Sequence, residues 1–269
     1  QGCSREPTVD EHMEVARALL AEAEGQIVMM RRQTRMEANT ALKAVLKKDR
    51  ANIEATTILG LTLFNMGEYA DAESKLDRAI ALGAAPSVVT PKLAQALLIL
   101  GEFERLDELT LTGLAPEGRS TVQAAKALSM IYRDNMPIAV ELMNAVRQNE
   151  AISPFAEVAE ARLVIEMQGY AEARELLLAQ LKRSPNYVPA LNLLGDVQSM
   201  LGQPAAAMKA YMRVSDLSEN SMAPSLNALL MRVYSGNYRR ALQETKRAES
   251  SNGRVLRNEG WRFMRGLLE

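Results

Sequence analysis

The chain has little of the chemistry on which most enzymes and metal proteins depend. It contains one cysteine, Cys3, and one histidine, His12. A single thiol cannot form an internal disulfide, and one cysteine with one histidine cannot supply the ligands of a zinc site. The motifs GxGxxG, GxxxxGKS/T, HExxH and GxSxG are absent from the sequence. We therefore expect a protein without catalytic residues, without a cofactor and without a metal.

Aromatic residues, net charge and long apolar runs are also scarce. Aromatic side chains make up 4% of the chain, and the formal net charge is -1, from 32 basic and 33 acidic residues. This balance argues against a nucleic-acid partner, whose phosphates would require an excess of basic residues. No apolar run of about 18 residues, the length of a membrane-spanning helix, is present. The chain is instead rich in alanine, leucine and methionine, which favour helices.

A pattern of small and bulky residues recurs with a period of about 34 residues. It consists of Leu-Gly, then Gly-x-Tyr-x-x-Ala, then proline. Its copies include Gly60, Gly67 and Tyr69; Ala94, Gly101 and Phe103; Gly195, Gly202 and Tyr211; and Gly236, Tyr238 and Ala241. The pattern resembles the tetratricopeptide repeat. That resemblance implies an all-α right-handed superhelix, an α-solenoid of about seven helix-turn-helix repeats.

The copy from residue 53 to 86 shows the steric logic of the pattern. Gly60 and Ala72 are small, so the two helices of the pair can cross closely, and Leu76 fills the space around the crossing. Gly67 is expected to end the first helix, because glycine adopts a left-handed backbone without steric cost. Pro86 cannot extend the second helix.

The predicted organisation is a short tail followed by one solenoid. Residues 1–9 form a flexible tail, and the solenoid covers residues 10–269. Its repeats lie near residues 10–52, 53–86, 87–119, 120–153, 154–187, 188–221 and 222–255, with a terminal helix at 256–269. The third repeat is expected to have a shortened second helix followed by a loop at 110–118, because that stretch has few helix-forming signals.

The two ends of the solenoid depart from the pattern. The first helix is predicted from Asp10 to about Arg32, capped by Thr8 or Asp10, although Gly25 stands where a shorter repeat would turn. The terminal helix is either the first helix of an eighth repeat or a cap that packs Trp261 inward.

The N-terminus and several repeat segments support a narrower resemblance. Gly2-Cys3-Ser4 resembles the end of a bacterial lipoprotein signal, where the peptidase cuts before the cysteine and Cys3 becomes lipidated. Residues 81–84, 101–103, 193–211 and 262–269 resemble the tetratricopeptide lipoproteins of the PEP-CTERM/exosortase system. This resemblance implies a membrane anchor at Cys3 and a place on the periplasmic face of the outer membrane. The alternative for the tail is an unmodified N-terminal thiol.

The tetratricopeptide resemblance also assigns candidate binding residues. In that family the fifth, ninth and thirteenth residues of each repeat point into a concave groove. The candidates are Thr57, Asn65, Gln95, Tyr132, Arg162, Glu166, Asn192, Asp196 and Tyr234. Such a surface suits an extended or helical peptide held by a few polar contacts. The alternative is that about half of these positions pack between repeats and bind nothing.

Two functions remain open on the sequence alone. The first is a non-enzymatic scaffold, anchored at Cys3, that recruits protein partners for exopolysaccharide export or for surface-protein or pilus assembly. The second is a soluble cytoplasmic adaptor or co-chaperone that binds peptide segments in the groove. A signal peptide encoded before residue 1 would favour the first function, and its absence would favour the second.

Overall fold

The computed structural model describes residues 6–218, 222–251 and 264–265. Within these residues the secondary structure is helical throughout, which confirms the predicted all-α class. The helices are α1 (Val9–Glu24), α2 (Val28–Lys48), α3 (Ile53–Asn65), α4 (Tyr69–Ala81), α5 (Pro86–Leu100), α6 (Phe103–Glu108), α7 (Pro116–Tyr132), α8 (Met136–Arg147), α9 (Pro154–Glu166), α10 (Tyr170–Arg183), α11 (Val188–Met200), α12 (Pro204–Leu217), α13 (Met222–Tyr234) and α14 (Tyr238–Ser251).

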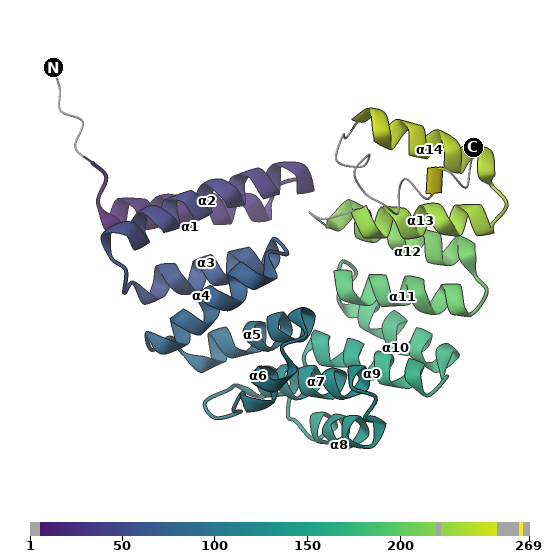
Figure 1. The fold of residues 1–269 in the computed structure, drawn as a ribbon, viewed down its shortest axis with the longest axis horizontal. Coiled ribbons are helices and arrows are strands. Elements are labelled where there is room, and N and C mark those ends of the chain that lie inside the picture. Colours follow the sequence, from purple (N-terminus) through teal and green to yellow (C-terminus); the bar gives the residue numbers. More distant parts are fainter. Residues whose placement is uncertain (1–5, 219–221, 252–263, 266–269) are drawn as a thin grey trace. The chain divides into compact units, whose positions relative to one another are not determined.

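The helices belong to two compact units. The N-terminal unit covers Gln1–Ala159 and the C-terminal unit covers Glu160–Glu269, so the boundary falls within α9. In the N-terminal unit α1 packs on α2, α3 on α4, and α7 on α8. In the C-terminal unit α11 packs on α12, which also packs on α13 (Figure 1). Consecutive helices therefore bury their apolar faces against their chain neighbours, as in repeat proteins.

The second repeat, α3 and α4, has the close helix crossing that its sequence predicts. A Cβ atom added to Gly60 would lie 2.8 Å from Cδ2 of Leu76 and 3.2 Å from its backbone nitrogen. Leu76 is fully buried at this crossing. Gly67 has a φ of 79°, so it supplies the left-handed residue after α3. A side chain at Gly60 would therefore displace the end of Leu76 and crowd the α4 backbone.

The first repeat begins differently from the prediction. Thr8 caps α1 and forms a capping box with Glu11, as expected for one of the two proposed caps. The helix ends at Glu24, so the prediction of one helix to Arg32 is wrong. Gly25 is the C-cap of α1, and α2 begins at Val28. The weak helix propensity of glycine and the extended backbone of Ile27 explain the break.

The third repeat contains the shortened second helix that the sequence indicates. Helix α6 has 6 residues and buries Leu106. The ammonium of Lys126 on α7 donates to the backbone carbonyls of Asp107 and Leu109, each at 2.8 Å. The next helix starts at Pro116 rather than at Ser120, because proline is favoured in the first turn of a helix.

The turn of the fifth repeat uses a residue that the pattern does not indicate. Gln168 has a φ of 64°, while Gly169 is the N-cap of α10 with a φ of -80°. A Cβ atom at Gly169 would lie 2.7 Å from Cγ1 of Val164. Glycine is thus required here for close packing, and the left-handed conformation falls on glutamine.

The predictions for both chain ends lie mostly outside the described residues. Cys3 and Trp261 are among the residues that the structure does not describe. Of the proposed terminal helix, Met264 is described and is buried with Leu229, Val233 and Ala241 of the seventh repeat.

Candidate functional site

The thirteenth position of each repeat lies at the end of its first helix and is exposed. This position carries large apolar side chains in four repeats. Ile99 is 52% exposed, Tyr132 56%, Met200 52% and Tyr234 70%. Asn65 and Glu166 occupy the same position and are also exposed. Exposed large apolar side chains that recur at one position are available for contact with a partner.

The fifth and ninth positions are more buried, which partly fits the alternative that they pack between repeats. Thr57, Gln95, Arg162, Asn192 and Asp196 are half-buried. In the fourth repeat these positions are occupied by alanine and leucine, which are buried. The fifth and ninth positions can therefore contribute to a binding surface only in repeats where they carry polar residues.

Arg162 and Glu166 form a polar pair on α9. A guanidinium nitrogen of Arg162 lies 2.8 Å from a carboxylate oxygen of Glu166, one helical turn further along. Nε of Arg162 is buried and has no hydrogen-bond partner among the described residues. A buried N–H group without a partner costs free energy, so the ion pair with Glu166 does not fully satisfy the Arg162 guanidinium.

Asp196 on α11 lies beside this pair and is held by a buried tyrosine. The Tyr211 hydroxyl donates to the Asp196 carboxylate at 2.6 Å. Burial raises the pKa of Asp196, and the hydrogen bond from Tyr211 and the positive charge of Arg162 act in the opposite direction. Burial and the contact with Asp196 raise the pKa of Tyr211, so its hydroxyl remains a neutral donor.

The absence of a side chain at Gly195 leaves room for the Tyr211 ring to reach Asp196. A Cβ atom at Gly195 would lie 2.5 Å from Cε1 of Tyr211, so the ring packs directly against the α11 backbone. Tyr211 is 3% exposed and had no place among the predicted binding residues. The Gly195-Asp196 pair in the sequence could have indicated Tyr211. A large residue that packs against a repeat glycine also lies close to the next residue of that helix, here Asp196.

The predicted residues of the N-terminal unit do not form a comparable polar cluster. The Gln95 side chain lies 3.5 Å from Nζ of Lys92 on the same helix, and that ammonium lies 4.7 Å above the Phe64 ring. Burial lowers the pKa of Lys92. Tyr132 instead stacks on Phe103, with ring centroids 6.3 Å apart. The structure therefore gathers only the C-terminal candidates Arg162, Glu166 and Asp196.

Two further site types are not found in the described part of the chain. Its histidine and carboxylate side chains form no group of three or more that could hold a metal ion. None of its helices has the length and apolar content needed to cross a lipid bilayer.

A family model matches the chain in two segments. Residues 30–89 and 158–221 match the tetratricopeptide repeat family model. These segments include the crossing at Gly60 and the cluster of Arg162, Asp196 and Tyr211. No curated protein sequence matches the chain.

Solved structures with this fold cover almost the whole chain. A tetratricopeptide repeat protein from Parabacteroides merdae ATCC 43184 is 19% identical, with a TM-score of 0.55, and the match covers 95% of this chain and 99% of that one. The human IFIT1 dimer with m7Gppp-AAAA is 13% identical with a TM-score of 0.60, over 91% of this chain and 68% of that one. At these identities the likeness shows the fold alone. The chain therefore has the all-α solenoid fold of tetratricopeptide repeat proteins, which generally act as non-enzymatic binding scaffolds.

Proposed function

We propose that the protein is a non-enzymatic scaffold that binds a peptide segment of a partner protein on the first helices of its C-terminal unit. The observation that carries this proposal is the cluster of Arg162, Glu166 and Asp196, with exposed Met200 at the end of α11 and exposed Tyr234 at the end of α13. Polar groups would fix the register of the peptide and the apolar side chains would contribute contact area.

Arg162 and Asp196 offer complementary contacts to a peptide. The guanidinium of Arg162, whose side chain is 33% exposed, can donate to a backbone carbonyl or a carboxylate of the peptide. Asp196 has one carboxylate oxygen engaged by Tyr211, and its other oxygen can accept from a peptide N–H or a basic side chain. Asn192, one turn earlier on α11, adds an amide that can both donate and accept.

Selection of binders from a random peptide library can test this site. Peptides selected on the wild-type chain should lose binding to the double variant Arg162→Ala with Asp196→Ala. The matched control is Arg174→Ala, because Arg174 forms an ion pair with Glu175 on the second helix of the same repeat. Equal binding by the double variant, with helicity unchanged by circular dichroism, would refute the proposed site.

We further propose that the scaffold is a lipoprotein anchored through Cys3 at the periplasmic face of the outer membrane. The support is the Gly2-Cys3-Ser4 start and the resemblance to tetratricopeptide lipoproteins of the PEP-CTERM/exosortase system. In this setting the partners belong to exopolysaccharide export or to surface-protein or pilus assembly. Stable anchoring follows from several acyl chains, since one chain gives only reversible binding.

Expression of the full gene in a bacterium fed labelled palmitate tests the anchor. The wild-type product should carry the label and fractionate with outer membranes, and Cys3→Ser should lose both properties. A soluble, unlabelled wild-type product would contradict the anchor and favour the cytoplasmic adaptor, without affecting the peptide-binding proposal.

We propose protein partners rather than RNA, even though the similar IFIT1 structure contains m7Gppp-AAAA. The net charge of -1 leaves little basic excess for phosphate contacts. A fluorescent capped oligonucleotide should accordingly show no saturable binding at physiological salt.

A further inference from the structure

A pocket with charged and hydroxyl groups in a partly apolar wall lies in the C-terminal unit, and the peptide-binding residues proposed above do not line it. It has a volume of about 200 Å³ and lies among α12, α13 and α14. Its wall consists of Met212, Ser215, Asp216, Ser225, Ala228, Leu229, Arg232 and Glu244. None of these residues occupies a fifth, ninth or thirteenth position of a repeat, so the peptide-binding proposal does not explain the pocket.

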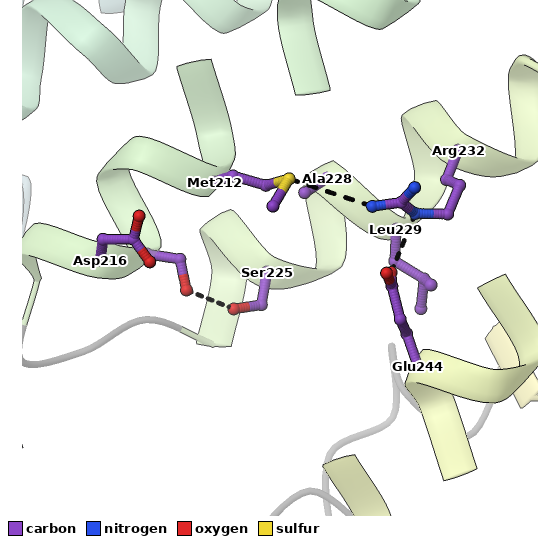
Figure 2. Close-up of a pocket in the computed structure, with 8 residues that line it drawn as sticks. Met212, Asp216, Ser225, Ala228, Leu229, Arg232 and Glu244 are labelled. Atoms are coloured by element: carbon purple, nitrogen blue, oxygen red, sulfur yellow. Dashed lines mark hydrogen bonds and ion pairs between the residues drawn. The ribbon is translucent and has the colours of Figure 1, made fainter. Parts of the chain in front are cut away.

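Arg232 is the most unusual residue of this pocket. The residue is 6% exposed, and its guanidinium points into the space bordered by Met212 and Glu244 (Figure 2). A buried guanidinium is costly unless its charge is paired and its five N–H groups are satisfied. Within the described part of the chain, one of its N–H donors contacts only the thioether of Met212, at 3.9 Å. Sulfur is a weak acceptor, so Arg232 retains donor capacity toward the pocket.

The carboxylate of Glu244, which pairs with Arg232, can be replaced by another carboxylate. Oε2 of Glu244 lies 2.9 Å from Nε of Arg232, but Nε makes no directed hydrogen bond. The Glu244 side chain is 41% exposed, and its other oxygen lies 3.6 Å from Nε of Arg240. Arg240 is one helical turn away on α14 and is well exposed. Glu244 can therefore turn to Arg240 and leave Arg232 to another carboxylate.

The other residues of the pocket wall restrict which ligands can bind. The Ser215 and Ser225 hydroxyls lie 2.8 Å apart, and either can donate to a ligand oxygen. Ala228 and Leu229 are buried apolar residues beside them. Asp216 stands beyond the serine pair, away from Arg232 (Figure 2). A second carboxylate at that end would meet the negative charge of Asp216, so a monocarboxylate fits better than a dicarboxylate.

We propose that this pocket binds a small carboxylate group, which pairs with Arg232 after Glu244 has moved to Arg240. A planar guanidinium binds a carboxylate through two parallel hydrogen bonds, which the present pair with Glu244 does not make. The carboxylate can belong to a free short acid or to the C-terminus of a peptide, because both present the same group attached to a small apolar stem.

Methionine methyl groups report on the pocket in the full chain. With the methionine methyls labelled for NMR, butyrate should shift the Met212 signal in a saturable way and leave Met200, on the first-helix face, unchanged. The neutral isostere butyramide should shift neither signal. An acetylated dipeptide of alanine with a free C-terminus should act like butyrate, and its amidated form should not. Tighter binding of the dipeptide than of butyrate identifies a peptide C-terminus, and the reverse identifies a free acid.

Two variants test the exchange of partners directly. Glu244→Gln removes the competing internal carboxylate and should tighten butyrate binding by roughly tenfold. Arg240→Gln removes the alternative partner of Glu244 and should weaken butyrate binding severalfold. Both side chains are partly exposed, so these tests do not depend on Arg232→Lys, a change at a buried position that can also unfold α13. The proposal is overturned if butyramide moves Met212 as butyrate does, or if Glu244→Gln leaves the affinity unchanged or lowers it.

Discussion

The second and sixth repeats share one steric solution but differ in the chemistry that fills it. In the N-terminal unit Leu76 packs against Gly60. In the C-terminal unit Tyr211 packs against Gly195 at the same sequence spacing. The residue after the glycine is Leu61 in the second repeat and Asp196 in the sixth. A hydrocarbon contact in one repeat is thus replaced in the other by a partly buried hydrogen bond to a carboxylate.

This difference separates the residues that maintain the fold from the residues that are available for binding. Glycine opposite a large side chain is favoured in both repeats, because a Cβ atom would crowd that side chain. The identity of the large side chain then decides whether the neighbouring position becomes apolar or polar. A repeat can therefore acquire a binding residue without changing its backbone.

The largest effect on stability is expected from removing the large apolar side chain at the α3–α4 crossing. Leu76→Ala should lower the free energy of unfolding of the N-terminal unit by about 2–5 kcal/mol, since it leaves a cavity between α3 and α4. Urea unfolding monitored by circular dichroism measures this loss. The matched control is Leu82→Ala, a half-buried residue just after α4, which should cost clearly less.

A methyl group at the polar crossing should have the next largest effect. Gly195→Ala should destabilise the C-terminal unit by about 1–3 kcal/mol, because a rigid ring cannot move as freely as the end of a leucine. Gly60→Ala should cost less, since the Cδ2 atom of Leu76 can rotate away. Hydrogen exchange of the α11 and α3 amides distinguishes the two losses, and a larger loss at Gly60 would contradict this comparison.

Tyr211 and Asp196 should be energetically coupled, which can be tested by replacing both with leucine, the residue at the equivalent positions of the second repeat. Tyr211→Leu alone leaves Asp196 half-buried without its donor, and Asp196→Leu alone leaves the tyrosine hydroxyl without its acceptor. The double variant removes both groups and should be more stable than the sum of the single changes predicts, by about 0.5–3 kcal/mol. Additive losses in a double-mutant cycle would show that the hydrogen bond has no net coupling.

The sixth repeat should respond to pH at a position where the second repeat has no titratable group. Burial raises the pKa of Asp196, so the folded protein binds this proton more tightly than the unfolded chain does. The associated stability is present in acid and is lost as the pH rises through the folded-state pKa. Asp196→Asn cannot titrate, so the stability of this variant should lack the fall that the wild type shows as the pH rises above the usual aspartate pKa of about 4. Urea midpoints measured across the acidic range for both proteins test the sign.

The smallest stability effect is expected at Arg162. Its ion pair with Glu166 is partly exposed and one helical turn long, so Arg162→Ala should change the free energy of unfolding by about 0.3–0.5 kcal/mol. The same variant should strongly weaken binding of the selected peptides. A loss of stability comparable to that of Leu76→Ala would mean that Arg162 serves mainly to maintain the fold.

The sequence predicted the frame of the fold because that frame rests on local sterics. Gly60 and Gly67 have the roles that their spacing indicates, and the shortened α6 follows from the helix-poor stretch after it. The break at Gly25 was assigned incorrectly, since a periodic apolar stripe continues across it. Gln168 was also unexpected, because the neighbouring glycine carries the stronger turn signal.

The candidate site was less accessible to sequence analysis because it depends on which side chains reach one another. Repeat positions identified Arg162, Glu166 and Asp196, and the structure brings these three together. The same rule named Gln95 and Tyr132, which have separate surroundings. Tyr211 and Arg232 lie outside the rule, and their importance follows only from burial and contacts.

The short α6 shows how a repeat can lose much of a helix and still remain part of the array. Each missing turn would have paired its own carbonyl groups, and a single ammonium from Lys126 now binds two of the carbonyls left over. One side chain on the following helix thus replaces two backbone hydrogen bonds. Deletions in such arrays should therefore be tolerated wherever the next repeat carries a long cationic side chain at the equivalent place.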